Sequence, residues 1–240
     1  MANRHGKDTK VLLGKYDISS YLNEVTPSMS MDTAETSTFG SSAKTYIMGQ
    51  HDGTVSMNGL FDGSANAVAA VFEDIVANDL TPAFTIAYDG GLTAGAGCSI
   101  GTAKQTTYEI GAPVGDVVTL NGEFQVTGGI RQGIILYTGS QSSSTNSSSI
   151  DNTSSTALGA TANLHVTANT RSTASTIKVQ HSVDNSAWVD LITFSSVSSS
   201  TLTNESLSVS GTVNRYLRVS TTLSAGTGSI TLTISIARRN

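Results

Sequence analysis

The 240-residue sequence contains one cysteine, Cys98, one tryptophan, Trp188, and three prolines. A single cysteine excludes a disulfide framework and a cysteine-based metal site. No run approaches the ~20 apolar residues of a membrane-spanning helix. The polar opening residues 1–10 hold no apolar stretch that would act as a signal peptide. We therefore expect maturation in a cytoplasm and no membrane partner.

Charge is also scarce, at 13% of the residues, and its sign is unevenly divided. Residues 1–157 carry 7 basic and 15 acidic side chains, a net charge of −8, whereas residues 158–240 carry 6 and 3, a net charge of +3. A surface that binds phosphates needs clustered Lys and Arg, so the acidic first part argues against one there. A surface with few charges gives a protein little protection against association. Such a surface is either covered by other subunits in an assembly or belongs to a hydroxyl-rich β-sandwich that exists alone.

No pattern for catalysis or metal binding is present. The histidines His5, His51, His165 and His181 are scattered, and none stands with a second histidine and a carboxylate at ligand spacing. A Gly-x-Ser-x-Gly elbow is absent. The glycine-rich stretch 95–101 lacks the following amphipathic helix that a dinucleotide loop needs. We predict no enzymatic activity, no catalytic residue, no cofactor and no metal.

What is abundant is Ser, Thr and Gly alternating with apolar residues, which is typical of β structure with many turns. The sequence predicts an all-β protein with one helix. Strands of the first part are expected at residues 11–13, 28–32, 54–61, 83–88, 106–110, 114–126 and 130–137. One phrase occurs twice, as Met57–Phe61 and as Leu120–Phe124, each with Asn-Gly at its centre. Asn-Gly favours a hairpin turn, but a bulge or bend within a long strand fits equally well, and the two copies either pair or occupy equivalent places in a sandwich.

The expected helix runs over residues 64–78, with Ser64 as its N-cap. Its apolar residues recur on one face and predict packing against a sheet: Val68, Val71, Phe72, Ile75 and Val76. Glu73 and Asp74 lie toward its C-terminal end, where the helix dipole disfavours acidic side chains. They form either a solvated acidic face or a surface for a basic partner.

The hydroxyl-rich residues 139–157 cannot bury enough apolar area to fold by themselves, which predicts a linker. The expected domains are therefore residues 1–138 and 158–240. In the second domain, six short strands separated by turn signals predict a β-sandwich of immunoglobulin-like or jelly-roll type. Trp188 follows a predicted turn there, and it either pins the two sheets together or displays its ring to a glycan.

The order of features between Asp17 and Gly63 is distinctive. An alternating run is followed by a polar loop, residues 33–44, in which Phe39 is the only large apolar side chain. A second alternating run and then the helix come next. This order resembles the tail tube (major tail) proteins of long, non-contractile-tailed bacteriophages, over roughly the first 140 residues. Phe39 either anchors the loop on its own core or, as the resemblance implies, inserts into a neighbouring subunit.

The resemblance implies a tail-tube-type β-sandwich or barrel domain whose copies form hexameric rings with a continuous inner β-barrel. Rings stacked head to tail make a tube through which DNA passes without specific binding, and the second domain decorates its exterior. The implied partners are further copies and other tail proteins such as the tape measure and terminator, in a virion assembled in the host cytoplasm. Four loop residues are implied in assembly, Thr36, Thr38, Phe39 and Lys44, and the helix residues Glu73 and Asp74 are added because a basic partner would relieve their unfavourable position in the helix dipole.

Two other readings stay open. A glycan-binding adhesin or receptor-binding module would use Trp188 as its sugar platform. A capsid decoration or head–tail joining protein would share the composition of a tube protein and differ only in its place on the particle.

Overall fold

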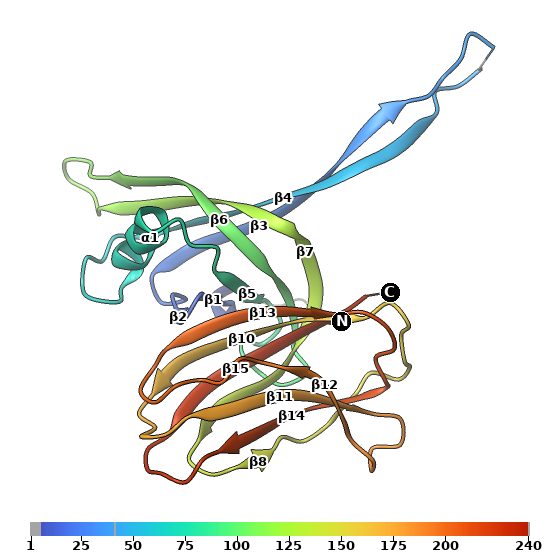
Figure 1. The fold of residues 1–240 in the computed structure, drawn as a ribbon. Helices are drawn as coiled ribbons and strands as arrows, with labels where there is room; N and C mark the ends of the chain where they lie inside the picture. The colour runs from blue at the N-terminus through green and yellow to red at the C-terminus, as the bar shows by residue number, and fades with distance from the viewer. Residues whose placement is uncertain (1–5, 41, 240) are drawn as a thin grey trace.

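The computed structural model describes residues 6–40 and 42–239, and strands are its main secondary structure (Figure 1). The expected all-β class with one helix is confirmed, because the described residues form two antiparallel sheets and one α-helix, α1 (Val68–Ala77). No helix in these residues is long and apolar enough to cross a membrane. His5 lies outside the described residues.

A short 3-10 helix, η1 (Gly6–Asp8), precedes the strands. The strands of the first half are β1 (Lys10–Leu13), β2 (Tyr16–Asp17), β3 (Leu22–Glu35), β4 (Tyr46–Leu60), β5 (Ala83–Ala87), β6 (Gly97–Gly111) and β7 (Thr119–Gln141). Those of the second half are β8 (Thr145–Asn146), β9 (Ile150–Asp151), β10 (Ala160–Asn169), β11 (Ser175–Ser182), β12 (Val189–Thr193), β13 (Thr203–Val209), β14 (Tyr216–Leu223) and β15 (Ile230–Arg238).

In the first half, a curved sheet carries α1 on one face (Figure 1). Phe72 of α1 packs edge-on against Phe124 of β7, with ring centroids 5.2 Å apart, at the centre of the core. Of the five apolar helix residues, four are buried and Val76 is exposed. The prediction that Ser64 caps the helix is wrong. The backbone N–H of Ala67 donates to the Ser64 carbonyl, so the chain completes a turn first and Ala67 takes the N-cap position without a side-chain bond.

The two copies of the repeated phrase lie opposite each other. In the antiparallel pair of β4 and β7, Asn58 faces Asn121 and Gly59 faces Leu120. Neither Asn-Gly forms a hairpin turn, because both lie inside strands. Gly122 allows a close approach: a Cβ there would stand 2.5 Å from Cε2 of Phe72. The missing side chain at Gly122, in the second copy of the phrase, thus lets Phe72 of α1 pack directly on the sheet.

The second half is a β-sandwich. One of its layers continues the first sheet through β7, β15, β10 and β13, and the other is the sheet of β12, β11, β14, β8 and β9. Apolar side chains from both layers form one buried core, including Leu164, Val179, Phe194, Leu217 and Ile234. The expected sandwich is therefore present.

The two halves share the strand β7, which is 23 residues long. Its first part pairs with β4, its second part pairs with β15, and β6 pairs with both parts. The segment 139–157, expected to be a linker, is not a free tether, because β8 and β9 pair with β14. Hydroxyl groups complete this attachment: Ser144 Oγ and Ser147 Oγ accept hydrogen bonds from backbone N–H groups of β14. The domain boundaries themselves stay a prediction.

A buried polar cluster also joins the halves. Thr85 Oγ1 of β5 lies 2.8 Å from His165 Nε2 of β10 and 2.8 Å from Ser235 Oγ of β15. The other ring nitrogen of His165 lies 2.7 Å from the Gly14 carbonyl oxygen. Asn163 Nδ2 donates to two carbonyl oxygens of β5 and β6. Buried polar atoms are costly unless they are paired, so these bonds fix how the second half sits on the first.

Candidate assembly surfaces

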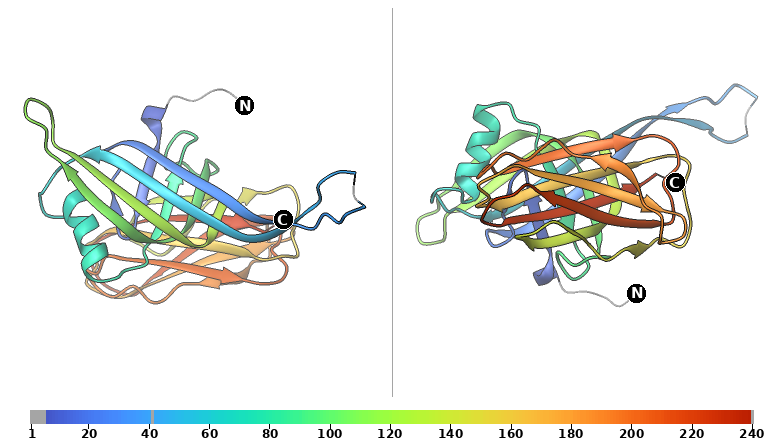
Figure 2. Two further views of the ribbon diagram at one scale, coloured as in Figure 1. Left: turned by 90° about the horizontal axis from the view of Figure 1, so that it is seen from above. Right: turned by 60° about the horizontal axis from the view of Figure 1, so that its bottom comes forward.

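The hairpin of β3 and β4 projects from the body as a two-stranded arm, residues 30–52 (Figures 1 and 2). β4 pairs with β7 only from Thr54 to Leu60, so residues 46–52 pair with β3 alone. All seven of these residues are exposed. A two-stranded ribbon without further packing is at best marginally stable in water. The arm therefore has the construction of an element that is completed by another surface.

The outer edge of β3 is also open. Within the described residues, this strand pairs only with β4, although it is 14 residues long. Such an edge presents backbone donors and acceptors that can pair with another chain. Pro27, in the middle of β3, is a residue that sheets place on edge strands. β3 thus offers a long edge that a neighbouring strand can extend.

The loop at the end of the arm is held by its own polar groups. Thr36 N donates to the Thr45 carbonyl at 2.8 Å, and the hydroxyls of the same two residues are 3.1 Å apart. Lys44 Nζ lies 3.0 Å from Glu35 Oε2. Thr38 and Phe39 lie in the same loop. Four of the six predicted assembly residues are therefore brought together here.

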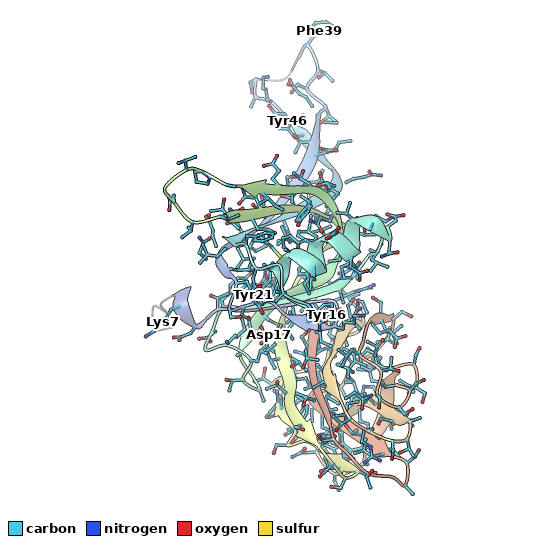
Figure 3. The ribbon with its side chains drawn as sticks, turned by 90° about the vertical axis from the view of Figure 1, so that its left-hand side faces the viewer. Lys7, Tyr16, Asp17, Tyr21, Phe39 and Tyr46 are labelled. Atoms are coloured by element: carbon cyan, nitrogen blue, oxygen red, sulfur yellow. The ribbon has the colours of Figure 1, made fainter. Side chains whose placement is uncertain are left out.

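Phe39 stands at the far end of the arm, away from the body (Figure 3). Its side chain is fully exposed, so it does not anchor the loop on the core of its own chain. Apolar Tyr46, Ile47 and Met48 follow it at the start of β4, and each is more than half exposed. The sequence interpretation missed these three residues. The sequence signal was the apolar run Tyr-Ile-Met, which follows the polar loop directly and could have been interpreted as the start of an exposed strand.

A second exposed apolar point lies at the opposite end of the same sheet. The turn between β6 and β7 carries Val114, which is fully exposed, and Val117 and Val118 beside it. The Phe61 backbone N–H bonds to the Val118 carbonyl oxygen, which brings an exposed aromatic ring to the same end. This turn and the arm extend in opposite directions (Figure 1).

Glu73 and Asp74, the other two predicted assembly residues, are on α1 and not on the arm. Both are exposed, and Asp74 Oδ1 accepts a hydrogen bond from Asn78 Nδ2 at 2.8 Å. Neither has a cation among the described ion pairs, whereas nearby Asp79 pairs with Lys104 at 2.7 Å. Burial and, second, the Glu73 charge raise the pKa of Tyr108. The structure thus separates the predicted assembly residues into an arm group and a helix group.

Trp188 lies outside the buried core of the sandwich, so it does not pin the two sheets together. Its ring is half-buried, and the Arg218 guanidinium carbon lies 4.2 Å from the ring centroid. Arg218 Nε donates to Gln180 Oε1, and Gln180 Nε2 donates to Asp190 Oδ1. This aromatic and polar row lies on the outer face of the second sheet, where a planar ligand would find a ring and directed polar groups.

The described residues hold no group of three or more His, Cys, Asp or Glu side chains placed to bind a metal ion. Cys98 is buried, and burial raises the pKa of its thiol to about 12. A thiol with that pKa stays protonated at neutral pH and is a poor nucleophile.

No family model and no curated protein matches the chain. It is similar in structure to the tail of a gene transfer agent particle with C6 symmetry, at 16% identity and a TM-score of 0.42 over 53% of this chain and 97% of that one. A subunit of the SPP1 tail tube is similar at 14% identity and a TM-score of 0.43, over 54% of this chain and 78% of that one. The SPP1 Dit protein, described as a hub of the adsorption apparatus, is 11% identical with a TM-score of 0.37, over 96% of this chain and 98% of that one. At these values the likeness is one of general fold at low identity.

Proposed function

We propose that this chain is a structural protein of a phage tail that assembles through its arm into rings, stacked as a tube. The observation that carries the proposal is the arm itself. In the part of the chain that the structure describes, it is a ribbon with no third strand, mostly exposed, and it carries exposed apolar side chains toward its tip. Burial of a Phe or Met side chain stabilises by about 1.5–3 kcal/mol, so covering this tip would favour assembly strongly.

The arm and the β6–β7 turn lie at different places on the subunit, so a contact between them is heterologous. Such a contact repeats from copy to copy, and it gives a ring if the rotation closes or a filament if it does not. The open edge of β3 would be extended by a strand of the next copy, which removes an exposed edge and builds a continuous wall. In this proposal, hexameric rings surround a lumen for DNA, and the second half decorates the outside.

The acidic balance of residues 1–157 supports a lumen that repels phosphate, so that DNA slides past without specific binding. Tape measure and terminator proteins would be the further partners in a virion. The row around Trp188 and Arg218 supports a second candidate function, glycan binding by an adhesin or receptor-binding module.

The experiment is negative-stain electron microscopy and light scattering of the purified chain at rising concentration. Wild type is expected to form rings or tubes. The variant Phe39→Ser, Ile47→Ser, Met48→Ser is expected to stay monomeric with an unchanged thermal midpoint. The matched control is Val183→Ser, Val189→Ser, which removes exposed valines from the second half and should assemble like wild type. A wild-type chain that remains monomeric at every concentration overturns the proposal.

A further inference from the structure

An arginine cluster lines a hollow where the two halves meet. The hollow has a volume of about 520 Å³, and Arg131, Arg238 and Arg239 line it together with Leu158. Arg131 follows a Gly-Gly bend in β7, whereas Arg238 and Arg239 follow one another at the end of β15. The cluster combines residues from both halves of the chain.

Only part of this positive charge is satisfied within the subunit. Arg238 donates to the carbonyl oxygens of Asn152 and Ser154, which fastens the preceding segment. Arg131 donates to one carbonyl oxygen at 3.4 Å, and Arg239 Nε is buried without a hydrogen-bond partner. None of the three arginines is in an ion pair among the described residues. Burial and, second, the charge of Arg239 lower the pKa of Arg131, so the two guanidinium groups repel one another.

Among the described residues no carboxylate pairs with Arg131 or Arg239, and two neighbouring guanidinium groups are unfavourable unless an anion joins them. The partner that supplies the anion must also match the apolar edge of the hollow, because Leu158 is 56% exposed beside the arginines. The fitting partner is therefore a surface that presents carboxylates next to an apolar side chain.

The outer face of α1 has this composition. It presents Glu73 and Asp74, neither of which is in an ion pair with another described residue, next to Val76, which is 49% exposed. In addition, α1 lies on one side of the molecule and β15 ends on the opposite side (Figures 1 and 2). Two complementary surfaces on opposite sides cannot meet within one copy, but they can meet between neighbours around a ring.

We propose that the arginine hollow receives the acidic face of α1 from a neighbouring copy, with Glu73 and Asp74 pairing with Arg131 and Arg239. This inference rests on the proposed assembly and names the lateral contact within it. The pairs would be partly desolvated by Leu158 and Val76. Acidic side chains near a helix C-terminus are disfavoured by the dipole of their own helix. The arginines of the neighbouring copy would offset this unfavourable interaction.

The test uses two charge-reversal variants of the full chain. Variant one is Arg131→Glu, Arg239→Glu, and variant two is Glu73→Arg, Asp74→Arg. Each alone places like charges in the contact, so each should need a roughly 10-fold or higher concentration to assemble. An equal mixture should assemble like wild type, because each variant then offers the surface that the other lacks.

Several results would overturn the inference. One is assembly of both single variants at the wild-type concentration. Another is a mixture that stays monomeric although both variants unfold at the wild-type temperature. If either reversal prevents folding, Arg131→Gln, Arg239→Gln provides the test, with Lys178→Gln, Arg215→Gln as the control of equal charge. The neutral arginine variant should lose the salt sensitivity of assembly that the control keeps.

Two further outcomes separate this inference from its alternatives. If wild type never assembles, the proposed function is wrong, and the lateral contact that rests on it is wrong as well. If wild type and variants assemble alike, and a short DNA duplex binds wild type but not the neutral arginine variant, the hollow binds nucleic acid and the inference is wrong.

Discussion

His165 Nε2 and Thr85 Oγ1 lie 2.8 Å apart in the buried junction between the two halves. The Gly14 carbonyl oxygen faces His165 Nδ1, so Nδ1 carries the proton and Nε2 accepts from the threonine hydroxyl. This arrangement holds the imidazole neutral. Desolvation by burial lowers the pKa of His165 to about 4, against the small opposing effect of the hydrogen bond to Gly14.

The first prediction is a loss of stability in mild acid. An unfolded histidine has a pKa of about 6.5, so between that pH and pH 4 the unfolded chain binds a proton that the folded chain does not. The contribution of neutral His165 is therefore complete above the unfolded pKa and is lost as the pH falls through the folded pKa. It amounts to a change on the order of 3 kcal/mol. Urea unfolding of wild type and His165→Gln at pH 7 and pH 4.5 should show a flatter dependence in the variant. His51→Gln, on the exposed arm, is the control and should keep the wild-type slope.

The second prediction concerns the approach of α1 to the sheet. Gly122→Val places side-chain atoms where Phe72 lies, since even a Cβ would stand 2.5 Å from that ring. The free energy of unfolding should fall by about 1–3 kcal/mol. Gly97→Ala is the matched control, because no atom lies within 4 Å of its added Cβ. Equal unfolding free energies for the two variants would contradict the proposed role of Gly122.

The third prediction concerns Arg171, which is 1% exposed. Its guanidinium donates to three carbonyl oxygens, those of Ser224, Gly226 and Gly228. Arg171→Met removes these bonds, and within the described residues only the Ser224 carbonyl keeps another donor, the Thr173 hydroxyl, so the substitution should cost about 3 kcal/mol in urea unfolding. Arg215→Met, which removes an exposed ion pair with Asp151, should cost clearly less. If the two substitutions cost the same, Arg171 does not organise the turn at residues 224–228.

The fourth prediction compares a surface aromatic residue, Trp188, with a core aromatic residue, Phe194, in the second half. Trp188→Ala removes a ring that contacts Arg218 outside the core, so it should cost only about 1 kcal/mol. Phe194→Ala, in the buried core, should cost about 3–5 kcal/mol. Thermal unfolding compares the two. A glycan array with wild type and Trp188→Ala then tests the second candidate function, which requires binding by wild type and its loss in the variant.

Much of the fold follows from local pattern. The helix face of Val68, Val71, Phe72 and Ile75 is buried as its period predicts, and the alternating strands of the second half form the expected sandwich. The helix start was misplaced because the turn at Ser64 depends on a backbone bond that composition does not reveal. Val76 was misassigned because the buried stripe of a ten-residue helix is narrower than its apolar residues indicate.

The candidate surfaces were predicted less completely, and for a physical reason. Exposure of Tyr46 and Met48 depends on where β4 leaves β7, and that register is a long-range property. The segment 139–157 was expected to be a tether because its own residues bury little. Its strands are stabilised instead by pairing with β14, more than sixty residues further along the chain. Likewise, Arg131 and Arg239 are brought together only by the pairing of β7 with β15.

The strand shared by both halves has a mechanical consequence. β4 continues from the arm into hydrogen bonds with β7, and β7 continues into hydrogen bonds with β15. Tension applied at the arm is therefore carried in shear along rows of backbone hydrogen bonds to the sandwich of the second half, without crossing a flexible connection. If the arm binds a neighbouring copy, as we propose, a pull on that copy reaches the second half of the subunit as a rigid displacement.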